Sequence, residues 1–316
     1  MDLEELWRAF PRDVAAFEEA FPDDEACRRH LVEVRWGGVP TCSRCSSTET
    51  WELSSGRFEC AKCGYQMSVT AGTPMHRTKK PLKMWFRAMW EVATHRTGIS
   101  AKDLQRCLGF GSYKTAWTWL HKLRSCMARP HRVPLRGDVQ VDDTYFGGNT
   151  RRPGRPKPGG RKALVFVAVE PGGRVRIEHA PDICTGTVKR FLDRSLDKNC
   201  TVTTDGYRSY NKTALDSRTH NKHIQKAKRN LTNDPLQHAH FVISLARRMW
   251  LGTYHGGTGK KHLQAYFDEF EFRFNRRKTN GVGRIMARLL HEFVNAGRIS
   301  YDSIVARQPF ARFETP

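Results

Sequence analysis

Two pairs of cysteines have the spacing of a metal site. Cys42 and Cys45 form one CxxC pair, and Cys60 and Cys63 form another after 14 intervening residues. Four thiolates at this spacing favour one closed, tetrahedral structural zinc site. The alternatives are a redox-active dithiol, which normally has a βαβ context that is lacking here, or four unrelated core cysteines. The segment between the pairs predicts a strand and then a return strand that runs to Tyr65, which is the outline of a zinc ribbon.

Two carboxylates, Asp142 and Asp205, lie in segments whose pattern otherwise predicts strands. Asp142 interrupts the alternating residues 139–146, and Asp205 directly follows residues 201–204 and precedes a glycine. An acidic side chain in a strand costs free energy unless it is paired or binds metal. If the two carboxylates meet, they can hold Mg²⁺ or Mn²⁺, which is the chemistry of metal-dependent phosphodiester cleavage. Taken alone, Asp142 also fits an edge strand facing water, and Asp205 fits an Asp-Gly turn.

His240 and Arg247 lie on a helix that is expected to begin after Pro235. They are seven residues apart and therefore share one face of the helix, whereas His238 points elsewhere. His240 also follows Asp205 by 35 residues, which is where nucleases of an RNase H-like fold place a third metal ligand. We therefore predict that His240 binds a catalytic metal and that Arg247 lies on the same side of the helix. A lone helical histidine is more often a surface or core residue, and that alternative stays open.

The elements around these side chains occur in the order of an RNase H-like fold. Strands and one helix are predicted in this order: strands 139–146, 163–169 and 175–180, helix 185–196, and strand 201–204. In that fold the first and fourth strands lie side by side. This adjacency would bring Asp142 and Asp205 together.

The segment between the cysteines and the first of these strands is predicted to be helical. Apolar residues at three- and four-residue intervals predict a core-facing helix at residues 82–93, and shorter helices follow at residues 100–107 and from Ser112 onward. The glycine-containing turn between the shorter helices favours a helix-turn-helix motif, although an ordinary helical hairpin fits the pattern nearly as well. In that motif the second helix contacts DNA, which gives these candidates: Ser112, Tyr113, Lys114, Thr115 and Lys122.

The charge of the chain indicates a polyanion as its partner. The formal net charge is +22 although the first 25 residues are acidic, so the remainder carries the whole positive excess. Part of it lies in a Pro/Gly-rich loop at residues 150–162, where Arg151, Arg152 and Arg155 are predicted to contact DNA unless the loop is merely solvated. The chain has no run of about 18 apolar residues and no signal-peptide pattern. We therefore expect a cytoplasmic, nucleoid-associated protein without membrane partners, whose cysteines stay reduced.

Taken together, the motifs resemble those of zinc-ribbon-bearing insertion-sequence transposases of the DDE class, over nearly the whole chain. The matching stretches are residues 42–63, 72–82, 141–148, 204–207, 252–255 and 269–277. The resemblance implies a zinc ribbon and helix-turn-helix that bind transposon ends, and an RNase H-like domain with an Asp, Asp, Glu triad. Here His240 stands at the Glu position, and Arg247 replaces the usual Lys, so the resemblance implies that Arg247 holds a DNA phosphate. A histidine ligand favours Mn²⁺ over Mg²⁺ and is compatible with either one or two catalytic ions.

The expected fold class is α+β multidomain, with a zinc ribbon and helix-turn-helix followed by an RNase H-like α/β catalytic domain. The expected parts are an acidic helical segment at 1–35, the ribbon at 36–72, the helix-turn-helix region at 73–130, the catalytic domain at 135–280 and a helical tail at 281–316. The resemblance implies cleavage of terminal inverted repeats and strand transfer into double-stranded target DNA. Two ends must be held together, so a homodimer or a larger synaptic complex is expected. The alternatives are a DNA-binding regulator with an inactive nuclease domain and a nuclease that cuts without joining.

Overall fold

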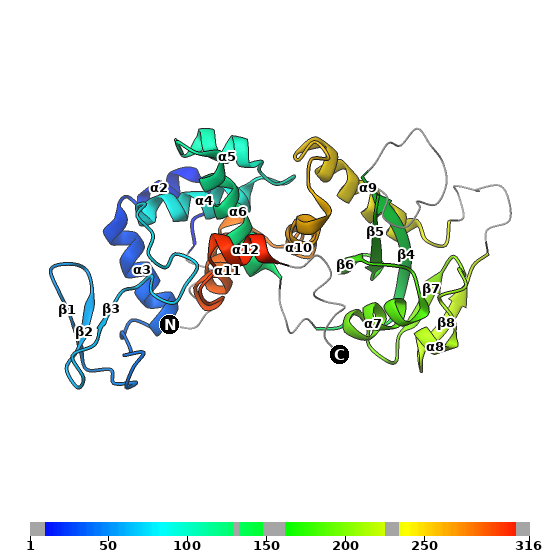
Figure 1. The fold of residues 1–316 in the computed structure, drawn as a ribbon, viewed down its shortest axis with the longest axis horizontal. Coiled ribbons are helices and arrows are strands. Elements are labelled where there is room, and N and C mark those ends of the chain that lie inside the picture. The colour runs from blue at the N-terminus through cyan, green and yellow to red at the C-terminus, as the bar shows by residue number, and fades with distance from the viewer. Residues whose placement is uncertain (1–9, 129–132, 148–161, 225–233, 308–316) are drawn as a thin grey trace. The chain divides into compact units, whose positions relative to one another are not determined.

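The chain divides into two compact units. The computed structural model describes residues 10–128, 133–147, 162–224 and 234–307 (Figure 1). Unit 1 comprises residues 1–127 together with 278–306, and unit 2 comprises residues 128–277 together with 307–316. None of the described helices is long and apolar enough to cross a membrane.

A small antiparallel sheet forms one part of unit 1. Its strands are β1 Thr50–Glu52, β2 Phe58–Cys60 and β3 Gln66–Met67, in the order β1-β2-β3. The position of β1 confirms the predicted first strand. The return strand does not run to Tyr65 as predicted but ends at Cys60, because the chain turns back there to present the second cysteine pair.

The rest of unit 1 is helical and is built around large aromatic side chains. The helices are α2 Val14–Ala20, α3 Asp24–Trp36, α4 Leu82–Thr94, α5 Ala101–Cys107, α6 Tyr113–Met127, α11 Val282–Asn295 and α12 Tyr301–Ala306. Trp85 of α4 stacks on Trp119 of α6 with ring centroids 3.4 Å apart, and Phe293 of α11 lies 5.5 Å from the ring of Trp85. α11, which lies in the segment expected to form a C-terminal helical tail, also packs against α3 and so contributes to the core of unit 1.

Helices α5 and α6 meet at a short turn, as the sequence pattern predicts. The hydroxyl of Ser100 caps α5 by accepting the N–H of Asp103 at 3.1 Å. Gly109 in the turn has a φ of 63°, a left-handed conformation that glycine adopts without strain. The three helices predicted between residues 82 and 127 are therefore confirmed as helices.

Unit 2 contains a five-stranded mixed sheet with the strand order β6-β5-β4-β7-β8. Its strands are β4 Asp138–Phe146, β5 Ala163–Val169, β6 Val175–Ala180, β7 Thr201–Thr204 and β8 Thr219–Lys222. β4 pairs antiparallel with β5 and parallel with β7, which confirms the predicted adjacency of the first and fourth strands. β8 and the short helix α8 Lys212–Leu215 were not predicted, because β8 is polar and mostly exposed and so shows no hydrophobic alternation. The arrangement is consistent with an RNase H-like fold.

Helices cover both faces of this sheet (Figure 1). α7 Thr185–Ser195 packs on the face that Val141 and Val202 share. α9 Gln237–Gly252 and α10 Leu263–Phe274, which follows the 3₁₀ turn η2 Lys260–His262, pack on the opposite face. Because side chains alternate along a strand, the polar side chains of β4 at every second position lie on the face that α9 covers.

Candidate functional site

The two cysteine pairs sit in turns of the same backbone geometry. In the first turn the N–H of Ser46 donates to the carbonyl of Cys42 at 2.8 Å, and in the second the N–H of Gly64 donates to the carbonyl of Cys60 at 2.9 Å. Ser46 and Gly64 both have a positive φ, 58° and 65° respectively. Each turn therefore builds half of the cluster from residues that are adjacent in sequence.

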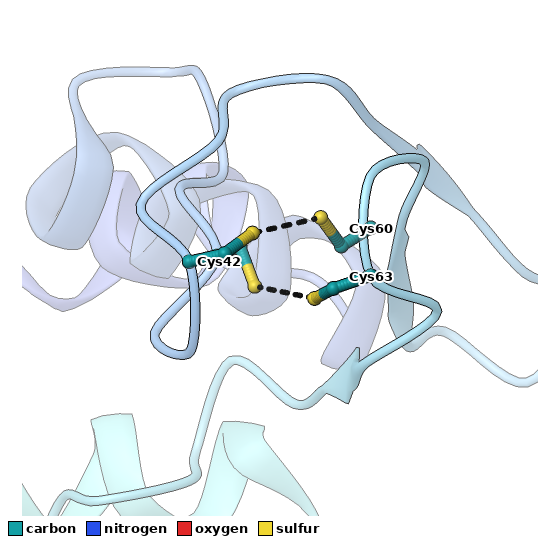
Figure 2. Close-up of side chains that lie close together, drawn as sticks. Cys42, Cys60 and Cys63 are labelled. Atoms are coloured by element: carbon teal, nitrogen blue, oxygen red, sulfur yellow. Dashed lines mark hydrogen bonds between the residues drawn. The ribbon is translucent and has the colours of Figure 1, made fainter.

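The four thiols form a cluster of the size that a zinc ion requires. All four sulfur atoms lie within 4.8 Å of one another, and in Figure 2 Cys42 faces Cys60 and Cys63. The Sγ–Sγ distance is 3.7 Å from Cys42 to Cys63 and 3.5 Å from Cys45 to Cys60. Sulfur atoms about 2.3 Å from a shared zinc ion in a tetrahedron would be about 3.8 Å apart, so the geometry fits. The four-cysteine cluster is therefore confirmed, and its ligand set is that of structural zinc.

Backbone N–H groups assist ionisation of the first thiol. Burial raises the pKa of the Cys42 thiol, but the N–H groups of Arg44 and Cys45 outweigh this effect, and the pKa falls to about 6. The N–H of Arg44 lies 3.4 Å from Cys42 Sγ. Because zinc binds the thiolate form, the turn prepares Cys42 for metal binding.

Asp142 and Asp205 occupy matching positions on neighbouring parallel strands. The ladder between β4 and β7 pairs Gln140 with Thr203. Continuing this register by two residues places Asp142 beside Asp205, which directly follows the last residue of β7. Neighbouring strands lie about 4.8 Å apart, and residues in register on parallel strands point to the same face. Sheet topology thus brings these two predicted site residues to one end of the sheet.

Helix α9 places His240 next to Asp142. The start of α9 is held on β4 by Gln140, whose side-chain oxygen accepts the N–H groups of His238 and Ala239 at 2.9 and 3.1 Å. These N–H groups belong to the first turn of the helix, which has no internal partners for them. His240 Nε2 then lies 3.4 Å from Asp142 Oδ2.

Another carboxylate, that of Asp234, holds the other ring nitrogen of His240. The distance from His240 Nδ1 to Asp234 Oδ2 is 2.5 Å. The hydrogen bond to Asp142 raises the pKa of His240, burial opposes the rise, and the hydrogen bond to Asp234 adds to it. The sequence analysis does not identify Asp234, because this residue precedes Pro235 and has no helical spacing relative to His240.

Arg247 lies on the same face of α9 as His240, which agrees with their seven-residue spacing. Its Nη2 donates to Thr144 Oγ1 and, at 3.5 Å, to the carbonyl of Tyr145. Thr144 lies two residues beyond Asp142 on β4 and hence on the same face of the sheet. Arg247 is exposed, so its positive charge faces solvent near the acidic side chains.

The phenol of Tyr210 lies next to Asp143, the residue that follows Asp142 on β4. Tyr210 is 3% exposed, and its hydroxyl lies 3.5 Å from Asp143 Oδ1. Burial raises the pKa of Tyr210 well above its usual range, and the charges of Asp143, Asp142 and Asp205 raise it further. The buried phenol therefore stays protonated beside these carboxylates.

Asp142 and His240 have the separation of two ligands of one divalent ion. Their 3.4 Å distance is near the spacing of about 3 Å expected for adjacent ligands that each lie about 2.1 Å from an ion in octahedral geometry. The side chain of Asp205 lies farther away and accepts the N–H of Tyr207 at 2.9 Å. Within the part of the chain that the structure describes, only the four cysteines form a group of three or more such ligands within 4.8 Å. We call Asp142, Asp205 and His240 together the acidic site. Their oxygen and nitrogen donors suit Mg²⁺ or Mn²⁺.

The start of α6 carries four of the side chains predicted to contact DNA. Ser112, Tyr113 and Lys114 are exposed, and Thr115 is half-buried. Lys114 Nζ lies 3.9 Å from the ring centroid of Tyr301, the first residue of α12. A tyrosine, a lysine and two hydroxyl groups thus gather at one end of a helix.

Lys122, which is predicted to contact DNA, also takes part in the packing of unit 1. Its Nζ donates to the carbonyl of Pro74 at 2.6 Å and lies 5.6 Å from the centroid of the Trp85 ring. Burial lowers the pKa of this lysine. Three further predicted DNA contacts lie outside the described residues: Arg151, Arg152 and Arg155.

Both units are similar to known protein domains. Residues 22–66 match the transposase zinc-ribbon domain, and residues 134–275 match the ISXO2-like transposase domain. A protein of Halobacterium salinarum, described as an uncharacterized protein in transposable element ISH50, is 24% identical to this chain over 280 residues. The matched region covers 81% of this chain and 92% of that protein.

Proposed function

We propose that this chain, which carries the zinc-ribbon and ISXO2-like domains of a transposase, cleaves the ends of an insertion sequence and transfers them into target DNA. The reaction site in this proposal comprises Asp142, Asp205 and His240, with Arg247 beside them. The observation that supports the proposal is the parallel register of β4 and β7: continued by two residues, it gives Asp142 and Asp205 matching positions, and His240 of α9 lies next to Asp142. Like charges at this spacing repel each other, and a bound cation removes that cost.

Each residue of the proposed site has a definite task. Asp142 and His240 hold one divalent ion between them, and Asp205 completes the ligand set from the end of β7. When bound, one or two ions of this kind lower the pKa of the attacking oxygen and stabilise the leaving oxygen of an in-line displacement at phosphorus. The chain itself supplies no covalent nucleophile, because water attacks in hydrolysis and the freed 3′-hydroxyl attacks in strand transfer.

Arg247 is proposed to hold a DNA phosphate at this site. Thr144 anchors one Nη group of its guanidinium on β4, two residues beyond Asp142. The planar guanidinium can bind a phosphate through two parallel hydrogen bonds, which lysine does not do. Its charge also offsets part of the negative potential of the carboxylates as DNA approaches.

DNA binding is proposed for the exposed start of α6. Helices α5 and α6 would then act as a helix-turn-helix, with Tyr113 and Lys114 at the DNA and the zinc ribbon adding contacts in the same unit. The high positive charge of the chain supports a partner that carries many phosphates. Because two transposon ends must react in one complex, we propose that the active form is a dimer or a larger assembly.

A strand-transfer assay tests the proposed function. Labelled duplexes that carry the terminal repeat flanking the gene are incubated with target DNA in Mg²⁺ or Mn²⁺. Asp142→Ala is expected to lower cleavage and joining at least about 1,000-fold, equivalent to about 4 kcal/mol in the barrier, because the variant lacks a metal ligand. Asp138→Ala is the matched control, since Asp138 is exposed and lies on the same strand and face as Asp142.

The outcomes of this assay separate the proposal from its alternatives. Joined product that survives Asp142→Ala contradicts the assignment of the site. Cleavage by the wild type without joining shows a nuclease that only cuts, and specific binding without cleavage shows a DNA-binding regulator.

A further inference from the structure

The carboxylate of Asp234 lies on the opposite side of the His240 ring from Asp142. Nδ1 of the imidazole faces Asp234 Oδ2 at 2.5 Å, and Nε2 faces Asp142 Oδ2 at 3.4 Å. The two nitrogens of one ring are therefore assigned to two different carboxylates. The shorter contact is the one to Asp234.

Asp234 is itself held firmly at the start of α9. Its other carboxylate oxygen, Oδ1, accepts the N–H of Leu236 at 3.0 Å, and its backbone carbonyl accepts the N–H of Gln237 at 3.2 Å. The side chain of Asp234 is only 9% exposed. Pro235 fixes its own φ and restricts the backbone of Asp234, the residue before it.

This arrangement determines which nitrogen of His240 can bind a metal. A neutral imidazole carries its proton on one nitrogen and its lone pair on the other. An ionised carboxylate can only accept a hydrogen bond, so the contact with Asp234 keeps the proton on Nδ1. The lone pair is then on Nε2, directed at the space beside Asp142.

We propose that Asp234 is a positioning residue that fixes the ring orientation and tautomer of His240, so that Nε2 is the metal-binding atom. This inference deepens the proposed function and rests on it, because it assumes that His240 is a metal ligand. Asp234 does not touch the ion or the DNA; it acts through His240. Carboxylates that hold the second nitrogen of a metal-binding histidine strengthen metal binding by about 10- to 100-fold.

The test uses Asp234→Asn in the full-length, zinc-loaded protein. The asparagine oxygen can still accept the N–H of Leu236, so the start of α9 is retained. The amide group then offers a donor to Nδ1, which moves the ring proton of neutral His240 from Nδ1 to Nε2. Nitrogen-15 NMR of His240 at alkaline pH, without added divalent metal, reports this change directly.

Binding of Mn²⁺, measured by electron paramagnetic resonance, is the second readout. Asp234→Asn is expected to weaken binding by about 10- to 100-fold, since Nε2–H cannot act as a ligand. Asp216→Asn serves as the control, because Asp216 is an exposed aspartate of unit 2 and precedes β8. Thermal unfolding of both variants shows whether unit 2 remains folded.

The results distinguish this inference from the proposed function. If Mn²⁺ binding is lost in Asp142→Ala, and Asp234→Asn keeps both the wild-type affinity and the Nδ1–H tautomer, the inference is wrong while the proposed site stands. If Mn²⁺ binding survives Asp142→Ala, the proposed site is wrong and the inference falls with it. A moved proton together with weakened binding in Asp234→Asn supports both.

Discussion

The zinc ribbon and the acidic site bring their ligands together by opposite means. The four cysteines lie within residues 42–63 and sit in two turns that share one hydrogen-bonding pattern. The proposed acidic site, made of Asp142, Asp205 and His240, would take one ligand from β4, one from the end of β7 and one from α9, and these are spread over residues 142–240. Local backbone geometry builds the first site, and the topology of a whole unit builds the second.

The two sites also differ in how fully the protein encloses the metal position. In the ribbon the chain supplies all four tetrahedral ligands, which leaves no position for a substrate. In the acidic site Asp142 and His240 are half-buried, whereas Asp205 is exposed and Arg247 faces solvent. The ribbon ligands are therefore enclosed by the chain, whereas the proposed acidic site is open to solvent, as a site that receives a substrate must be.

The largest expected effect is the loss of the ribbon fold when one thiol is removed. Structural zinc contributes an apparent 10–16 kcal/mol, on the order of the values for zinc-finger peptides, so Cys42→Ser should leave the ribbon unfolded. Hydrogen exchange of residues 40–67 and the zinc content by mass spectrometry measure this. Cys107→Ser is the control, because Cys107 is exposed and lies outside the cluster. If the Cys42→Ser protein keeps the full zinc content of the wild type, Cys42 is not a required zinc ligand.

A substitution in the acidic site should abolish activity without unfolding unit 2. Asp205→Asn is expected to lower DNA cleavage about 100-fold or more, about 3 kcal/mol in the barrier. Because Asp205 is exposed, the free energy of unfolding of unit 2 should change by less than about 1 kcal/mol. Cleavage kinetics and denaturant unfolding provide the two numbers. If Asp205→Asn unfolds unit 2, the carboxylate has a structural role and the contrast with the ribbon weakens.

Lowering the pH should destabilise unit 1 through His30 and stabilise unit 2 through His240. Burial among Phe10, Phe21 and Phe86 lowers the pKa of His30 from 6.5 to about 4. The unfolded chain therefore takes up a proton on His30 first, and unit 1 loses about 3 kcal/mol as the pH falls from 6.5 to about 4. The pKa of His240 is raised instead, so its contribution is complete below pH 6.5 and is lost as the pH rises through the folded-state pKa.

Two variants isolate these contributions in unfolding experiments. His30→Phe should reduce the loss of unfolding free energy that unit 1 shows as the pH falls. His240→Gln should reduce the loss of unfolding free energy that unit 2 shows as the pH rises. Hydrogen exchange followed by mass spectrometry reads the two units separately over this pH range. Equal pH dependence of wild type and His30→Phe would show that His30 titrates normally in the folded protein.

The smallest expected effect concerns DNA contacts at the start of α6. Lys114→Ala should weaken DNA binding by about 1 kcal/mol. It should also make the slope of log K against log salt concentration shallower by about 1, as the loss of one phosphate contact does. Fluorescence anisotropy at several salt concentrations measures both quantities. Lys198→Ala, at an exposed position of unit 2, is the control. An unchanged affinity for Lys114→Ala would mean that α5 and α6 form a structural hairpin.

The sequence predicts much of the framework because its signals are local or periodic. CxxC spacing identifies the ribbon ligands, hydrophobic alternation locates β4 and β6, and a continuous apolar run locates β5. The order of these elements predicts that β4 and β7 are neighbours, and the structure confirms this. Helical spacing also places His240 and Arg247 on one face of α9.

The features that sequence analysis misses depend on contacts between distant or irregular segments. Asp234 reaches His240 from outside the helix, so helical spacing does not reveal it. The hydrogen bond from Lys122 to the carbonyl of Pro74 joins residues 48 positions apart, so the helical pattern does not reveal it. β8 is a polar strand whose position comes from pairing with β7 rather than from burial of its own side chains.

Anomalous X-ray scattering from crystals soaked in Mn²⁺ tests the central claim most directly. The account predicts a zinc peak about 2.3 Å from all four cysteine sulfurs and a separate manganese peak in contact with Asp142, Asp205 and Nε2 of His240. Manganese bound elsewhere in unit 2, with Asp142 and Asp205 making no contact to it, would contradict the claim that the β4–β7 register builds the catalytic site.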